Sequence, residues 1–205
     1  MFDCRLFSRC VLPLLLFAAV PMLPQGRVPQ KPAQNSSVRP NVLLITIDTL
    51  RPDHLFCYGY HEIQTPAIDS LAVDGIRFVQ AYTPNPITLP SHSVILTGTY
   101  PMMNGMHDFS GNNLNPQQAT LATVLKGRGY DTGAVIAAAV LDRRFGLNHG
   151  FDFYYDHFDF SRLSESNLDL MERPANQVID QALSWLAGHG KKPWVFSPCS
   201  PNPSP

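Results

Sequence analysis

The sequence contains few lysines and no cluster of basic residues. Lys and Arg together number 15 against 16 Asp and Glu in a chain of 205 residues, which leaves a formal net charge of −1. A protein that tracks the phosphates of DNA or RNA needs a basic stripe or patch. The composition therefore excludes a nucleic-acid polymer as the partner, and the length suits one ordinary domain.

Cysteine is also rare, with four residues in all. Cys4 and Cys10 fall in an N-terminal apolar segment, so only Cys57 and Cys199 would belong to a folded domain. Their separation does not match the short paired spacings of zinc sites. We expect two unpaired thiols, and a disulfide between them is the alternative in an oxidising compartment.

No apolar run is long enough for a comfortable membrane span. The run VLPLLLFAAVPML at 11–23 follows Arg5 and Arg9, and a span needs about 20 apolar residues. Residues 1–23 are therefore predicted to be a signal peptide that directs export to the periplasm or the extracellular space. An uncleaved signal that anchors the protein in the membrane is the alternative, because no clear small-residue cleavage site follows. Residues 24–40, rich in Pro, Gln and Ser, are predicted to be a flexible linker.

Apolar runs predict the strands of the folded region. VLLITI at 42–47 and GAVIAAAV at 133–140 are continuous, which is typical of strands buried on both faces. IRFVQAY at 76–82 alternates as a half-buried strand does. WVFS at 194–197 begins one more strand.

Segments with helical signals separate these strands. Helices are expected within 65–75, where Pro66 suits the first helical position, and within 91–98, 116–129 and 174–190. The last of them places five apolar side chains on one face: Val178, Ile179, Ala182, Leu183 and Leu186. Strands that alternate with helices predict an α/β fold with a mostly parallel sheet flanked by helices.

Asp48 directly follows the first apolar run. Ligands of parallel sheets gather at the carboxyl ends of the strands, and a carboxylate at that edge suits a hard divalent cation. The alternative is that Asp48 only shapes the turn after the strand, because Asp is a common turn residue. Position alone leaves both interpretations open.

The stretch PITLPSHSVILTG, residues 86–98, places four residues ahead of a short apolar helix: Thr88, Pro90, Ser91 and His92. Helix capping is one interpretation, because Pro suits a first turn and a hydroxyl can satisfy free N–H groups. A nucleophile is the other interpretation. The positive end of a helix attracts an anionic ester, and a metal can lower the pKa of a hydroxyl held there.

Several segments in order resemble the N-terminal half of the sulfatase family, which belongs to the alkaline-phosphatase superfamily. They are NVLLITIDTLRPDHLFCYGY, TPAIDSLAVDGIRFVQAYTPNPITLPSHSVILTGTYP, TLATVLKGRGYDTGAVIAAAVLDRRFGLNHGFDFYYD and the helix ending in SWLAGHGKKPW. The resemblance spans about residues 40–195. It implies an alkaline-phosphatase-like fold, incomplete here, and hydrolysis of sulfate or phosphate esters with a divalent metal, calcium or zinc.

The resemblance also assigns roles to two residues. Asp48 matches the first metal-binding aspartate of the family. Thr88 stands where sulfatases carry the cysteine that is oxidised to formylglycine, and TLPSH resembles the nucleotide pyrophosphatase/phosphodiesterase branch, in which a Thr of a similar string is the nucleophile. Thr88 is therefore expected to be the catalytic nucleophile. Formylglycine is not expected, because Thr cannot be converted by the cysteine route.

Other positions depart from the sulfatase pattern. Thr49 stands where many sulfatases have a second metal-binding aspartate, and His92 replaces the usual arginine. AVIAAAVLDRRFGL occupies the region in which sulfate-contacting Lys and His residues normally occur. His92 and Arg143 are the candidate substrate-binding residues, and a local ion pair in a solvated turn is the alternative for Arg143.

The last eight residues are mostly Pro and Ser. Because Pro cannot donate to a sheet ladder, the strand that begins at Trp194 is not expected to continue into them. Residues 41–197 are predicted to be a partial sulfatase-like N-terminal domain, and 198–205 a Pro/Ser-rich tail that resembles the product of a frameshift or truncation. A natural disordered tail is the alternative.

These observations favour a sulfatase-like, metal-dependent hydrolase of a small-molecule or glycan ester of sulfate or phosphate. One carboxylate and one hydroxyl do not form a tight divalent site, so the chain alone is expected to be weakly active or inactive. A non-catalytic anion-binding module derived from a hydrolase is the alternative. The sequence does not specify the oligomeric state.

Overall fold

The computed structural model describes residues 39–109, 113–162 and 171–200. The predicted signal peptide, nearly all of the predicted linker and the last five residues of the predicted tail lie outside the described residues. Within the described ranges, no helix combines the length and the hydropathy that a membrane crossing requires.

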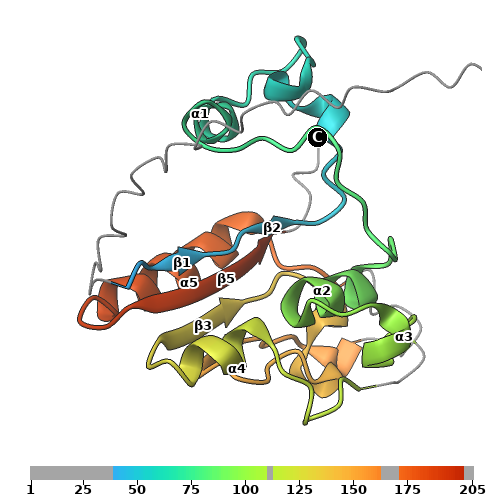
Figure 1. The fold of residues 1–205 in the computed structure, drawn as a ribbon, viewed down its shortest axis with the longest axis vertical. Helices are drawn as coiled ribbons and strands as arrows, with labels where there is room; N and C mark the ends of the chain where they lie inside the picture. The colour runs from blue at the N-terminus through green and yellow to red at the C-terminus, as the bar shows by residue number, and fades with distance from the viewer. Residues whose placement is uncertain (1–38, 110–112, 163–170, 201–205) are drawn as a thin grey trace, which may run out of the picture. The chain divides into compact units, whose positions relative to one another are not determined.

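Five strands form a sheet in which every pairing between named strands is parallel (Figure 1). They are β1 (Val42–Leu43), β2 (Thr46–Ile47), β3 (Asp131–Val135), β4 (Phe153–Tyr155) and β5 (Trp194–Ser200). β5 pairs with β1 and β2 on one side and with β3 on the other, and β3 pairs with β4. This arrangement confirms the predicted α/β fold with a mostly parallel sheet.

β5 extends to Ser200, so the prediction that the strand would stop before Pro198 was wrong. The N–H of Leu44 donates to the carbonyl of Phe196 at 2.9 Å, and the N–H of Asp48 donates to that of Ser200 at 3.0 Å. Even-numbered residues of β5 therefore direct their backbone groups toward β1 and β2. The nitrogen of Pro198, which carries no hydrogen, faces the two residues between β1 and β2, where neither strand pairs with β5. The proline therefore removes no hydrogen bond from the paired parts of the sheet.

In chain order, the described helices all lie between the first strand, β1, and the last, β5. They are α1 (Pro66–Asp74), α2 (Thr88–Thr97), α3 (Pro101–Asn104), α4 (Leu121–Lys126) and α5 (Ala175–Gly188), with short 3-10 turns η1 (Pro52–His54), η2 (Phe56–Tyr58), η3 (Ala139–Leu141), η4 (Arg143–Phe145) and η5 (Phe160–Arg162). α4 begins later than the sequence predicted. Thr120 caps it, because its hydroxyl accepts from the N–H of Thr123 at 3.1 Å while the Thr123 hydroxyl accepts from the N–H of Thr120 at 2.8 Å.

The alternation of side chains along β3 and the segment after it separates two apolar clusters. Val135 and Ala137 pack with α5, whereas Ile136 and Ala138 pack with α2. The predicted apolar face of α5 was right only in part. Val178, Ala182 and Trp185 are buried, and Ile179 and Leu183 are exposed. Residues at i, i+4 and i+7 follow one stripe of a helix, and the bulky Trp185 completes that stripe.

The run 42–47 forms strands β1 and β2 as predicted, but its predicted burial was wrong, and the predicted strand at 76–82 was wrong altogether. Leu43 and Ile45 are 50% and 53% exposed, so the run 42–47 is not buried on both faces. The segment 76–82 forms no strand, and its Ile76 and Tyr82 are 85% and 87% exposed. An alternating pattern becomes a strand only when a neighbouring strand completes its backbone hydrogen bonds. None of the described strands pairs with 76–82.

The Trp185 ring of α5 lies so close to Gly133 of β3 that no side chain fits there, which provides a test of the fold. A Cβ at this position would lie 2.7 Å from Trp185 Cε2 and 2.8 Å from Phe196 Cδ2, and both rings are buried. Gly133→Ala is therefore expected to lower the free energy of unfolding by about 1–3 kcal/mol, because neither ring has room to retreat. Urea unfolding measures this loss.

The matched control is Gly188→Ala, where a Cβ would meet no atom within 4 Å. Its free energy of unfolding is expected to change by less than about 1 kcal/mol. Equal losses in the two variants would contradict the tight contact between Gly133 and Trp185.

Candidate functional site

β2 and α2 bring Asp48 and Thr88 into direct contact. Asp48 follows β2 at the carboxyl edge of the sheet, and Thr88 is the first residue of α2. The Thr88 hydroxyl donates a hydrogen bond to Asp48 Oδ2 at 3.0 Å. The sequence-predicted metal ligand and the sequence-predicted nucleophile therefore meet, although 40 positions separate them in the chain.

The Thr88 hydroxyl does not cap α2. The N-cap residue is Ile87, and α2 has no capping hydrogen bond from a side chain at that position. The Ile87 N–H instead donates to Asn85 Oδ1 at 2.9 Å, which orders the entry into the helix. Gly98 then ends the helix in the left-handed region at φ 66°. The geometry therefore does not favour the capping interpretation of Thr88.

The turn after Asp48 is strained. Thr49 has φ 54°, and it is the one residue other than glycine with positive φ in the described part of the chain. Its N–H donates to Asp48 Oδ1 at 3.0 Å. A β-branched residue in this region costs about 1–3 kcal/mol. The strained turn fixes one carboxylate oxygen and leaves the other to Thr88, and such strain is often found at functional sites.

The charges around the site limit what it can bind. The negative Asp48 carboxylate lies beside the N-terminus of α2, where the helix dipole stabilises it. An anionic sulfate or phosphate ester at the same helix end would be repelled by this carboxylate. A cation between the two would offset the repulsion. The described residues alone do not fit such a metal, because they contain no group of three or more His, Cys, Asp or Glu side chains placed to hold one.

His92 lies on the inner side of α2 and contacts β2 and β5. Its Nδ1 is 2.8 Å from the Thr88 carbonyl oxygen, and its Nε2 is 3.2 Å from Thr46 Oγ1 and 3.5 Å from Cys199 Sγ. Burial lowers the pKa of His92, and the bond to Thr88 and the charge of Asp48 oppose this effect only in part. The ring of this predicted substrate-binding residue is thus held by protein groups.

Cys199 is buried and free, and Cys57 is free as well, as the sequence predicted. Burial raises the pKa of the Cys199 thiol to about 11. The thiol is therefore protonated near neutral pH and is a poor nucleophile. Sequence reasoning missed both Cys199 and Thr46 as neighbours of the site. The only available signal was that Thr46 and Asp48 share a strand face two residues apart.

Arg143, the other predicted substrate-binding residue, is held by Asp156. Its Nε donates to Asp156 Oδ2 at 2.7 Å, and its Nη2 bonds Asp156 Oδ1 and the Tyr154 carbonyl oxygen. Burial would raise the pKa of Asp156, but the hydrogen bonds from Arg143 outweigh it and hold the pKa below its usual value. None of the hydrogen bonds of Arg143 in the described structure reaches Asp48 or Thr88.

Several curated proteins are similar to this chain in sequence. Human arylsulfatase D is 32% identical over 166 residues, which cover 72% of this chain and 27% of that protein. The N-acetylglucosamine-6-O-sulfatase of Bacteroides thetaiotaomicron is 32% identical over 172 residues, which cover 80% of this chain and 31% of that protein. The chain thus spans less than a third of the length of these relatives.

Solved structures share the fold. A protein solved in complex with its substrate D-glucosamine-2-N,6-O-disulfate superimposes with a TM-score of 0.65 at 25% identity, over 79% of this chain and 34% of that one. The phosphonate monoester hydrolase of Agrobacterium radiobacter gives a TM-score of 0.62 at 22% identity, over 82% and 42%. The family model named Sulfatase matches residues 40–202. This chain therefore belongs to the sulfatase family, which has the alkaline-phosphatase-like fold.

Proposed function

We propose that the chain supplies the nucleophile, Thr88, and one metal-binding carboxylate, Asp48, of a hydrolase of sulfate or phosphate esters. The observation that carries the proposal is the hydrogen bond from the Thr88 hydroxyl to Asp48 Oδ2 at 3.0 Å, at the N-terminus of α2. A hydroxyl becomes a nucleophile when a neighbouring group accepts its proton. Asp48 is placed to do so.

In the proposed reaction Thr88 Oγ1 attacks the sulfur or phosphorus of the ester while its proton passes to Asp48 Oδ2. A bond from Oγ1 to sulfur or phosphorus forms as the bond to the ester oxygen breaks, and the departing alkoxide takes a proton from water, which leaves hydroxide. Hydroxide then attacks the sulfur or phosphorus of the ester on Thr88. Hydrogen sulfate or hydrogen phosphate leaves, and Thr88 Oγ1 regains its proton from Asp48. The free N–H groups and the dipole of the first turn of α2 stabilise the developing negative charge.

A divalent cation, calcium or zinc, is part of the proposal. It would neutralise the repulsion between Asp48 and the anionic ester and act as a Lewis acid on the ester oxygens. Asp48 is the one ligand assigned to it among the described residues. Because that set is too small for a tight site, we propose weak activity for the chain on its own. Formylglycine is not part of the proposal, because the residue is Thr.

The proposed substrate is a sulfate or phosphate ester of a sugar or another small molecule. Two similar proteins support a sulfated sugar as the substrate: the one solved with D-glucosamine-2-N,6-O-disulfate, and the N-acetylglucosamine-6-O-sulfatase of Bacteroides thetaiotaomicron. Export is proposed from Arg5, Arg9 and the apolar segment that follows them.

The second candidate function is a non-catalytic module that binds an anion at α2. The small ligand set around Asp48 favours it. The two functions differ in their need for Thr88, because an anion-binding module requires the helix end but no nucleophile.

Thr88→Ala is expected to reduce hydrolysis to the background rate, because it removes the attacking oxygen. Thr88→Ser should retain part of the activity. The free energy of unfolding of the Ala variant should fall by only about 0.5–1.5 kcal/mol, the worth of one hydrogen bond. The assay is release of 4-nitrophenol from its sulfate and phosphate esters with Ca²⁺ or Zn²⁺ present.

Wild-type turnover by the Ala variant would contradict the nucleophile assignment. If the wild-type chain releases no product from either ester but binds inorganic sulfate, the non-catalytic module is the better description. Thr88→Ala should then leave sulfate affinity nearly unchanged.

Asp48→Asn is expected to weaken binding of Ca²⁺ or Zn²⁺ by more than about tenfold, because it removes the negative charge from the proposed ligand. The control is Asp53→Asn, since Asp53 forms an exposed ion pair with Arg51. It should change metal affinity little. Calorimetric titration of the three proteins measures the effect, and equal affinities would mean that Asp48 only shapes the turn.

Arg143→Gln is expected to lower stability rather than substrate affinity. The Asp156 side chain is 3% exposed, whereas that of Arg143 is 54% exposed. Removal of the guanidinium leaves a buried carboxylate with fewer partners and should cost about 1–2 kcal/mol after allowance for solvent screening. Because the folded-state pKa of Asp156 is lowered from 3.8, this contribution is present above pH 3.8 and lost as the pH falls through the lowered pKa.

Thermal unfolding across this pH range tests the prediction. The comparison variant is Arg144→Gln. It removes one hydrogen bond of 3.2 Å to Asp142 and the contact of the guanidinium with the Phe160 ring, and it should cost less because one nitrogen, not two, bonds the carboxylate. A tenfold rise in KM for Arg143→Gln with unchanged stability would instead establish Arg143 as a substrate contact.

A further inference from the structure

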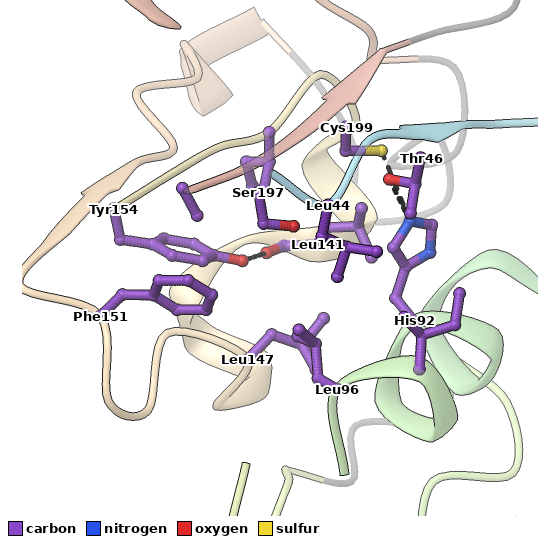
Figure 2. Close-up of a pocket in the computed structure, with 13 residues that line it drawn as sticks. Leu44, Thr46, His92, Leu96, Leu141, Leu147, Phe151, Tyr154, Ser197 and Cys199 are labelled. Carbon is purple, nitrogen blue, oxygen red and sulfur yellow. Dashed lines mark hydrogen bonds between the residues drawn. The ribbon is translucent and has the colours of Figure 1, made fainter. Parts of the chain in front are cut away.

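The proposed reaction leaves His92, the titratable side chain of α2, without a role. His92 lies one turn after Thr88, and it lines a pocket between α2 and the sheet, with its ring turned toward Thr46 and Cys199 (Figure 2). Apolar side chains line most of this pocket, including Leu44, Leu96, Leu141, Leu147 and Phe151. The polar groups Thr46 and Cys199 lie at the end where His92 enters.

The hydrogen bonds of His92 define its protonation. A backbone carbonyl oxygen can only accept, so the Nδ1 that lies 2.8 Å from the Thr88 carbonyl carries the proton. In a neutral ring Nε2 is then an acceptor, and two donors face it, the Thr46 hydroxyl at 3.2 Å and the Cys199 thiol at 3.5 Å. Burial, which lowers the pKa of His92, favours this neutral ring. The uncharged ring therefore donates one hydrogen bond from Nδ1 and accepts one at Nε2.

These two bonds connect the two elements that carry the proposed site. The Thr88 carbonyl belongs to the residue whose hydroxyl contacts Asp48. Thr46 lies on β2, two residues before Asp48. The hydrogen bonds from His92 to Thr88 and Thr46 thus link α2 to β2 next to the hydrogen bond from Thr88 to Asp48, which links the same two segments. Rotation of the first turn of α2, or its displacement along β2, would break both.

We propose that His92 is a positioning residue that ties the first turn of α2 to β2 and so holds the Thr88 hydroxyl against Asp48. This role rests on the proposed assignments of Thr88 and Asp48. It differs from substrate binding, because both ring nitrogens are directed at protein groups. The Cys199 thiol on β5 is a further partner of Nε2, because 3.5 Å is an ordinary hydrogen-bond distance for sulfur.

The test measures whether Thr88 and Asp48 act as a pair. In the full chain without metal, unfolding free energies are determined for Thr88→Val, Asp48→Asn and the double variant. A hydrogen bond between the two makes their effects non-additive, and we expect a coupling of at least about threefold in the unfolding equilibrium constant. In a His92→Phe background, which keeps an aromatic ring but loses both bonds, this coupling should vanish.

A second variant and a control variant keep the test decisive if His92→Phe does not fold. Thr46→Val is nearly isosteric and removes only the β2 end of the tie, so it should reduce the coupling even if His92→Phe does not fold. The matched control is His189→Phe. His189, which follows the last residue of α5, makes the same kind of contact, from Nδ1 to the carbonyl oxygen of Trp185 at 2.7 Å. Its loss should leave the coupling between Thr88 and Asp48 unchanged.

The outcomes separate this inference from the proposed function. Coupling that persists in both the His92→Phe and the Thr46→Val backgrounds overturns the positioning role, as does the absence of coupling in the wild-type background. A nitrogen NMR signature of a neutral ring protonated at Nδ1 supports the role, and protonation at Nε2 overturns it. None of these measurements requires turnover. If Thr88→Ala still hydrolyses esters, the proposed function fails while the tie through His92 is tested independently.

Discussion

The parallel pairing of β2 with β5 is the constraint on which the candidate site depends. The N–H of Asp48 donates to the carbonyl oxygen of Ser200, the last residue of β5. This bond fixes the backbone from which the carboxylate projects. The strained Thr49 then orients one carboxylate oxygen and leaves the other for Thr88. A residue from the Pro/Ser-rich end of the sequence therefore positions the first residue of the proposed chemistry.

The second constraint is electrostatic. The N-terminus of α2 stabilises negative charge, and in this structure the carboxylate of Asp48 already lies there. A sulfate or phosphate ester needs the same helix end, so substrate and carboxylate compete unless a cation lies between them. The proposed metal dependence follows from this competition as well as from family membership. The tie through His92 adds no charge, because a neutral ring meets the need for hydrogen bonds in a partly buried place.

Local sequence patterns predicted the elements whose signals are complete within a few residues. Pro66 marked the start of α1, Gly98 marked the end of α2, and the alternation of strands and helices gave the parallel sheet. The elements that failed depend on a partner elsewhere. The segment 76–82 alternates correctly but pairs with none of the described strands, and β5 passes through Pro198 because the gap between β1 and β2 faces it.

The sequence by itself determined the family and proposed Asp48 and Thr88 as site residues, because both lie in motifs that are short and contiguous. Only the tertiary structure decided how they meet. The hydroxyl of Thr88 turns to Asp48 and not to its own helix, and the ring of His92 turns inward to Thr46. These contacts join positions 40 and 46 residues apart in the chain. Contacts at such separations follow from the packing of α2 on the sheet, which no local pattern encodes.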